Sequence, residues 1–292
     1  MRFFMRRVWM LALLPFLGHA QSEPNGAGLD SGSLPDRWAS GGPNCDAFPK
    51  WQVHQYNENF YVLRESGCTN YEKPFLFLFF GSERALLLDT GAGDVDTAEP
   101  VKALLARKRR PLIVAHTHGH GDHIAGDKQL AALEDVIVIP PKLDDIKTTF
   151  GIRQWPSDVG SIDLGNRRLD VIPIPGHDAV SLAFYDRSTG ILLTGDTLYP
   201  GRLYIADFQL YVASVERLVK FTSDKPVAHI LGNHIEQTST PYLDYPIRTK
   251  YQPEEHALAL GRAHLLELSA ALEEMKSHPV KQALRDFTIW PR

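Results

Sequence analysis

A dense cluster of metal-ligand side chains lies between residues 116 and 123 of this 292-residue chain. Four histidines and one aspartate stand within this stretch, directly after an apolar run at 112–114. Imidazoles and a carboxylate at the end of a strand form the ligand set of a catalytic zinc site, or less often of an iron or manganese site. The alternative is a solvated histidine-rich loop that binds metal loosely.

Further ligand-type residues follow three later apolar runs. His177, Asp196 and His234 each come just after such a run. A glycine stands one or two residues before each of them, and glycine permits a sharp turn and a close approach of the backbone. These additional ligands at matching strand ends favour a built metal site over a loose loop.

The order of these residues resembles the metallo-β-lactamase superfamily. Residues 118–123 match its HxHxDH motif, and the spacing fits only when the motif begins at His118 rather than His116. The resemblance spans about residues 51–234 and implies an α/β (α+β) fold, a four-layer αββα sandwich with metals at one edge. The seven matching ligand positions are His118, His120, Asp122, His123, His177, Asp196 and His234.

The resemblance also implies how the ligands are divided between two metals. One metal is expected on His118, His120 and His177, a second on Asp122, His123 and His234, with Asp196 bridging both. Two zinc ions are the expected cofactors, with iron or manganese as alternatives. Paired metals acidify water to a pKa of about 7 and polarise a carbonyl, so a bridging hydroxide would attack the carbonyl carbon.

Two other acidic or histidine positions have expected supporting roles. Asp122 would orient the nucleophile and shuttle its proton. Asp89 would either brace the ligand loop by hydrogen bonds or cap a turn at a strand end. His116 lies at a strand end where it can support the loop, and His229 and His264 are expected to pack within a strand and on a helix.

Asp196 gives the best indication of the reaction. Class B metallo-β-lactamases usually have Cys, Ser or another residue at this position, whereas residues 194–198 resemble glyoxalase II and related thioesterases and lactonases. Tyr199 stands at an offset similar to that of a substrate-binding tyrosine in quorum-quenching lactonases, so it is a candidate catalytic residue, with packing as the alternative. The resemblance therefore implies a hydrolase that cleaves an ester, lactone or thioester.

Glyoxalase II is an incomplete match beyond His234. Its glutathione-binding segment and full helical domain are not recognisable, so its substrate is not carried over. The tyrosine-rich segment 242–251 is either a wall of the substrate site or aromatic packing under the last helix.

Three other functions remain as alternatives. An exported β-lactamase fits the leader sequence but not Asp196. An iron oxygenase of the persulfide dioxygenase kind would use one metal on the same fold. A non-enzymatic metal-binding module would not need a carboxylate that orients hydroxide, the role expected of Asp122.

The apolar pattern predicts the elements that position these residues. Helices are indicated at 97–107, from the histidine loop to about 133, and in part of 143–160. Two helices have clearer signals, one after Asp207 as N-cap and one from about Pro253 to Met275. Strands are predicted at 51–63, 75–80, 85–88, 112–115, 136–139, 169–174, 180–185, 191–194 and 227–231.

The chain begins with the features of a secretory signal peptide. Three arginines precede an apolar stretch at 8–17, and small residues at 18–20 resemble a cleavage site. An uncleaved anchor is the alternative, although the stretch is too short to span a bilayer comfortably. We therefore expect removal of residues 1–20, no membrane attachment afterwards, and a secreted or periplasmic protein.

Charge and composition limit the partners and the domains. Cleavage removes three arginines and no acidic residue, which changes the formal net charge from −4 to −7. Nucleic acids are therefore not expected as partners, because contacts to their phosphates require Lys and Arg. A small-molecule substrate is expected instead. The oligomeric state is left open. Residues 21–44 read as a flexible lead-in to one hydrolase domain over 45–292. Cys45 and Cys68 either pair in an oxidising compartment or remain free thiols.

Overall fold

The computed structural model of the protein describes residues 28–39 and 41–292. In this part of the chain, two mixed β-sheets of six strands each form the centre of the fold. The first sheet contains β1 (Trp51–Asn57), β2 (Phe60–Glu65), β3 (Phe75–Phe80), β4 (Ala85–Leu88), β5 (Leu112–Ala115) and β6 (Val136–Val138), in that order. The second contains β7 (Gly160–Asp163), β8 (Arg168–Pro173), β9 (Leu182–Asp186), β10 (Ile191–Gly195), β12 (His229–Gly232) and β13 (Ala259–Leu260), in the order β13-β12-β10-β9-β8-β7.

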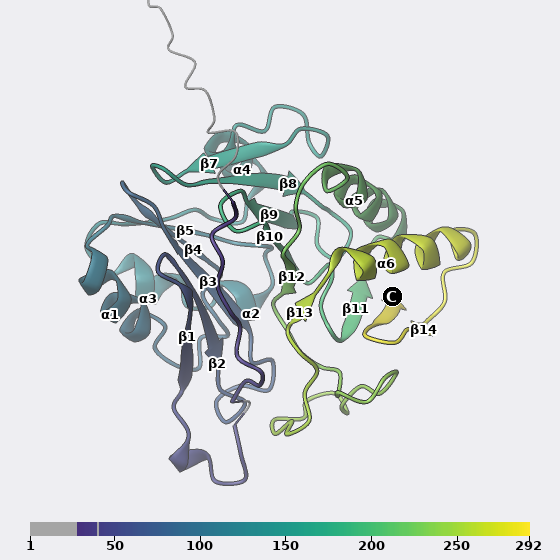
Figure 1. Ribbon diagram of the computed structural model, residues 1–292, viewed down its shortest axis with the longest axis horizontal. Coiled ribbons are helices and arrows are strands. Elements are labelled where there is room, and N and C mark those ends of the chain that lie inside the picture. The colour runs from purple at the N-terminus through teal and green to yellow at the C-terminus, as the bar shows by residue number, and fades with distance from the viewer. Residues whose placement is uncertain (1–27, 40) are drawn as a thin grey trace, which may run out of the picture.

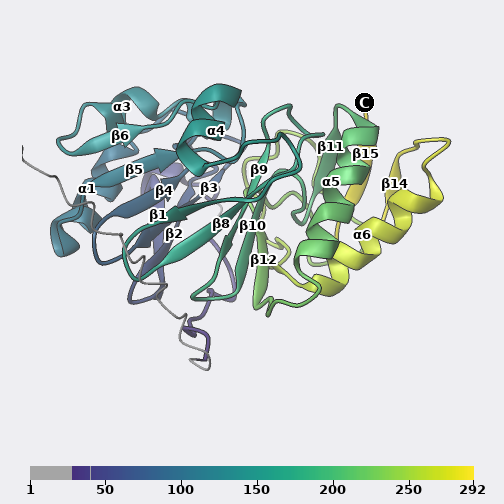
Figure 2. The ribbon, with the colours of Figure 1, turned by 90° about the horizontal axis from the view of Figure 1, so that it is seen from above.

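Helices cover the outer face of each sheet, so the molecule has four layers in the order αββα (Figures 1 and 2). On the first sheet lie α1 (Ala98–Lys108) and α3 (Asp127–Ala131), and on the second lie α5 (Phe208–Phe221) and α6 (Arg262–Glu274). The described residues also contain the short helices α2 (Gly121–Ile124) and α4 (Leu143–Phe150). This architecture confirms the predicted fold.

Three apolar clusters hold the layers together. The middle cluster joins the inner faces of the two sheets, for example Phe77 and Phe79 with Phe184 and Leu193. The outer clusters join each sheet to its own helices. Because β3 is buried along its whole length, both of its faces are apolar, as its unbroken apolar sequence predicts.

The structure differs from the sequence prediction at several places, one of which is β7, a strand that was not predicted. The strand predicted at 51–63 is a hairpin, β1 and β2, paired antiparallel around a turn at 58–59. The last helix begins at Arg262 rather than near Pro253, because the intervening residues 259–260 form β13. A small third sheet of β11 (Arg202–Ile205), β15 (Thr288–Pro291) and β14 (Gln282–Ala283) was not predicted.

The segment before β1 lies against the domain. Residues 1–27, which include the expected signal peptide and the start of the lead-in, are outside the described residues. In the described part, the backbone N–H of Ser33 donates to Tyr56, and the buried Trp38 ring packs edge-on against Phe75 at 4.8 Å between centroids. This part of the expected flexible lead-in is therefore anchored to the first sheet.

Cys45, in the single-turn helix η1 (Cys45–Ala47), and Cys68, in the turn after β2, form a disulfide. The alternative of two free thiols does not apply. Among the described residues, no helix combines the length and apolar character that a bilayer crossing requires.

Candidate metal centre

Four of the predicted ligands follow β5 at the edge of the first sheet. His118 and His120 lie in the loop after this strand, and Asp122 and His123 lie in the single turn of α2. Asp89 holds the loop in place by accepting hydrogen bonds from the backbone N–H and the hydroxyl of Thr117.

The other three ligands follow strands of the second sheet. His177 comes after β8, Asp196 directly after β10, and His234 after β12. Gly195 has a φ of +54°, and a Cβ at this position would lie 2.9 Å from Cβ of Thr117. Glycine is therefore required where the loops of the two sheets approach each other.

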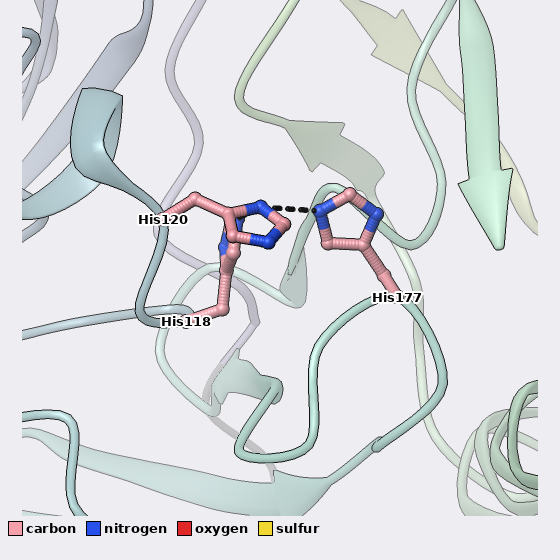
Figure 3. A group of neighbouring side chains, drawn as sticks. All are labelled: His118, His120 and His177. Carbon is pink, nitrogen blue, oxygen red and sulfur yellow. Dashed lines mark hydrogen bonds between the residues drawn. The ribbon is translucent and has the colours of Figure 1, made fainter. Parts of the chain in front are cut away.

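Three imidazole nitrogens converge to form the first half of the site (Figure 3). Nδ1 of His120 lies 3.1 Å from Nε2 of His118 and 3.0 Å from Nε2 of His177. A tetrahedral zinc ion with Zn–N bonds of about 2.0–2.1 Å would separate its ligand nitrogens by about 3.3 Å. The three nitrogens therefore fit one metal ion without rearrangement.

A second group of three atoms lies beside the first. Nε2 of His123, Nε2 of His234 and Oδ2 of Asp122 form a triangle with 3.3 Å on each side. Two nitrogens and a carboxylate oxygen at this spacing fit a second metal ion.

Asp196 stands between the two groups and turns one oxygen to each. Its Oδ2 lies 3.8 Å from His118 Nε2 and 3.6 Å from His177 Nε2, while its Oδ1 lies 3.6 Å from His123 Nε2 and 3.4 Å from His234 Nε2. Oδ1 is buried and has no hydrogen-bond partner. A buried carboxylate oxygen without a partner is costly, and a cation between the groups would satisfy it.

Four of the ligand histidines are fixed in orientation by their other ring nitrogen. Each presents Nε2 to the site and hydrogen-bonds through Nδ1, which sets the tautomer that a metal ligand needs. The Nδ1 partners are Thr117 Oγ1 for His118 (3.1 Å), Asp89 Oδ2 for His123 (3.0 Å), the Tyr204 carbonyl for His177 (2.7 Å) and the Glu72 carbonyl for His234 (2.9 Å).

Asp89 is the central buried anchor of the ligand loops. Its carboxylate accepts from the backbone N–H of Thr117 and from the Thr117 hydroxyl, both at 2.8 Å, from His123 and from the Asn233 amide at 2.7 Å. It therefore connects the loop after β5 with the residue before His234. Of the two expected roles, bracing by hydrogen bonds describes Asp89.

Burial and neighbouring charges determine the protonation of the site. Burial, together with the nearby His123, lowers the pKa of His118 well below its ordinary value, which keeps that imidazole neutral as a metal ligand requires. Burial alone would raise the pKa of Asp196, but His234, His123 and His118 hold it well below its usual range. Burial opposes charge on His234 also, yet Asp196 and Asp122 raise its pKa to about 9. The site thus contains ionised carboxylates that attract cations.

Tyr199 does not direct its hydroxyl into the site. The side chain is buried, its ring packs edge-on against His234, and its hydroxyl donates to the backbone carbonyl of Arg202 and lies 3.2 Å from Glu236 Oε2. Tyr199 therefore has the packing role, which the sequence analysis gave as the alternative. Its hydroxyl is not placed to donate the predicted hydrogen bond to a substrate.

Three histidines that the sequence analysis discussed lie outside the ligand set. His116 is buried, with Nδ1 3.3 Å from the His123 carbonyl, so it supports the loop as expected. His229 is half-buried against Tyr56. His264 does not pack on the buried face of its helix; its Nδ1 accepts from the Gly261 N–H at 2.9 Å and caps α6.

A pocket with a volume of about 200 Å³ adjoins the metal centre. Its walls come from five separate parts of the chain and were not predicted as a unit, although the sequence raised segment 242–251 as a possible substrate wall. Tyr242 and Tyr251 are 62% and 45% exposed, so they do not pack under the last helix. The lining residues are Tyr71, Glu72, Lys73, Arg202, Tyr204, Ile235, Glu236, Pro246, Ile247, Arg248, Thr249, Gln252 and Arg292.

Comparisons with known proteins agree with this geometry. A family model described as "Metallo-beta-lactamase superfamily" matches residues 75–229. A hydroxyacylglutathione hydrolase from Brucella anthropi is 32% identical over 69% of this chain and 76% of its own, and the human acyl-coenzyme A thioesterase MBLAC2 is 26% identical over 63% and 81%.

Solved structures show the same fold. A metallo-beta-lactamase from Pontibacter korlensis superposes with a TM-score of 0.55 at 17% identity, covering 76% of this chain and 99% of that one. TMB-1 gives the same TM-score at 15% identity, covering 79% of this chain and all of that one. At these identities the likeness concerns the fold alone.

Proposed function

The chain belongs to the metallo-beta-lactamase superfamily and is a metal-dependent hydrolase, and we propose that it cleaves thioesters of small molecules with two bound metal ions. The observation that carries this proposal is the position of Asp196, which presents one oxygen to each of two three-ligand groups. The relatives named as glutathione and coenzyme A thioester hydrolases support thioesters over the ester and lactone alternatives.

The residues of the metal centre fit two zinc ions, and each of them would have a distinct role in catalysis. Two zinc ions bound there would acidify a water molecule and polarise the substrate carbonyl. Asp122 shares its Oδ2 with the second group while its side chain is 21% exposed, so its other oxygen can hold the attacking water and accept its proton. His120 is exposed, so the first group is open to solvent on that side.

Export is a further part of this proposal. The Cys45–Cys68 disulfide supports it, because disulfides persist in oxidising compartments and are rare in the cytosol. Sequencing the N-terminus of the protein recovered from the periplasm or the medium tests this, and a chain that begins at Gln21 is the expected result. A cytosolic chain that retains Met1 would contradict it.

Turnover of matched substrates by the zinc-loaded protein tests the function. We would compare a glutathione thioester, an acyl-coenzyme A, a lactone and a chromogenic cephalosporin, with His120→Ala as the inactive control. We expect the two thioesters to be hydrolysed faster than the lactone and the cephalosporin, and we expect two metal ions per chain. Preferential hydrolysis of the cephalosporin would instead identify a β-lactamase, and one iron per chain with oxygen uptake on persulfides would identify a dioxygenase.

A further inference from the structure

The pocket beside the metal centre shares two residues with the support of the metal ligands. The Glu72 carbonyl holds Nδ1 of His234, and the Tyr204 carbonyl holds Nδ1 of His177. Both residues line the pocket, so a single imidazole ring separates its wall from a ligating nitrogen of each metal group. The pocket therefore lies close enough to both groups to hold the far end of a substrate whose reacting carbonyl is at the metals.

The pocket contains a buried lysine with unused donors. Lys73 is 1% exposed, and its Nζ donates to the Thr249 carbonyl at 3.1 Å. An ammonium group has three N–H donors. The carboxylate that acts most strongly on Lys73 is already taken, because Glu255 binds Arg64 through both oxygens at 2.5 and 2.7 Å. Among the described residues Lys73 forms no direct ion pair.

Arg248 is a second cation without a carboxylate partner. It also lines the pocket, its guanidinium stands 5.9 Å from the centroid of the Tyr71 ring, and it forms no direct ion pair in the described part of the chain. Arg202, by contrast, is neutralised by Glu236 at 3.2 Å and by Asp244 at 3.6 Å.

The charges of the lining do not balance. With Arg202 and Glu236 paired, Glu72 is the one side-chain carboxylate left against Lys73, Arg248 and Arg292. Burial lowers the pKa of Lys73 to about 8, although the nearby Glu255 and Glu236 act in the opposite direction, so the charged form of this side chain is held here at a cost. Groups that are kept charged and unpaired in a cleft are typical of a ligand site.

We infer that this pocket binds an anionic group, a carboxylate or a phosphate, at the thiol end of the substrate, with Lys73 and Arg248 as its direct partners. The inference rests on the proposed thioester hydrolysis for the identity of that end. Glutathione carries carboxylates and coenzyme A carries phosphates, so the two thiol carriers share the required chemistry. Neutral thioesters gain nothing from the pocket and are expected to be poorer substrates through KM rather than kcat.

Direct binding of unreactive thiol analogues tests the inference. S-methylglutathione and desulfo-coenzyme A lack a free thiol, so they do not bind metal through sulfur, and isothermal titration calorimetry measures their affinity for the zinc-loaded protein. Arg248→Gln and Lys73→Met are each expected to weaken the binding of one analogue by at least about tenfold, the effect of losing a hydrogen bond to a charged group.

Lys250→Gln is the matched control, because Lys250 is an exposed cation two residues from Arg248 that does not line the pocket. It should change affinity less than twofold. The analogue that binds identifies the carrier, carboxylate or phosphate.

The outcomes separate the pocket from the reaction. Thioester turnover with no binding of either analogue, or with equal affinity in Arg248→Gln and the unaltered protein, would overturn the pocket assignment and leave the proposed function standing. Binding that depends on Arg248, without thioester turnover, would support the anion site and overturn the function.

Discussion

The metal centre and the adjoining pocket are built on opposite principles. In the metal centre, all seven ligands follow strands or lie in α2 close behind one, and a network around Asp89 connects the loop after β5 with the segment before His234. The pocket is formed mostly by irregular segments beside β11, and its cations Lys73 and Arg248 form no direct ion pair among the described residues. Reaction chemistry thus lies on rigid strand ends, whereas substrate selection is left to loops that can change without disturbing it.

The largest expected effect is the loss of a metal ligand. His120→Ala removes one of three nitrogens from the first group, so we expect turnover to fall by about a thousandfold or more, since the positioned metal supplies several kcal/mol of transition-state stabilisation. The affinity of the pocket for an unreactive thiol analogue should change less than threefold. Equal loss of turnover and of analogue binding would show that the two regions are not separable.

Lys73→Met should stabilise the protein while it weakens binding. The pKa of Lys73 falls from 10.5 to about 8 on folding, so below pH 8 the charged side chain costs about 3 kcal/mol of unfolding free energy. This cost decreases as pH rises from 8 to 10.5, because only the unfolded chain then retains the proton.

Urea denaturation of Lys73→Met and the unaltered protein at pH 7 and pH 10 measures the effect. The variant should have the higher unfolding free energy at pH 7, and the difference should be smaller at pH 10. A difference that is independent of pH would contradict the role of charge.

Asp89→Asn tests the anchor of the metal centre. The change keeps the shape of the side chain but removes the charge that faces His123 and the acceptor for one of its donors. We expect the affinity for the second metal ion to fall by about 10- to 100-fold, with less effect on the first. Competition titration with a zinc chelator measures both affinities, and equal weakening of the two would show that Asp89 supports the whole site.

Tyr199→Phe is expected to have the smallest effect on catalysis. Its hydroxyl donates to the Arg202 carbonyl, so its loss should cost about 1 kcal/mol of stability and change kcat less than threefold. A decrease in kcat of tenfold or more, at unchanged zinc content, would instead restore the substrate contact that the sequence suggested.

The metal centre was predictable from sequence because each ligand follows an apolar run. An apolar run marks a strand, and strands of both sheets that end at one edge bring His177 to His118 and His234 to His123. The motif spacing also excluded His116 from the ligand set, and the structure places that side chain behind the loop.

The pocket and several elements were not predictable for identifiable physical reasons. Segments around 72, 202 and 248 approach through tertiary packing that leaves no periodic signal. The hairpin turn at 58–59 contains Glu and Asn without glycine or proline, so it reads as continuous strand. The last helix was started too early because apolar Leu260 fits a helical period but belongs to β13.

The Cys45–Cys68 disulfide makes substrate preference depend on the redox conditions under which a protein sample was prepared. It closes a 23-residue separation, a cross-link that contributes on the order of 3 kcal/mol, and it secures the turn that leads to Glu72 and Lys73 in the pocket wall. Protein prepared in a reducing cytoplasm would lack this disulfide, so the segment that contributes Glu72 and Lys73 to the pocket wall would be less constrained while the metal site stayed intact. Two laboratories with different expression hosts could then report the same kcat and different substrate preferences, and counting free thiols in each sample would reconcile them.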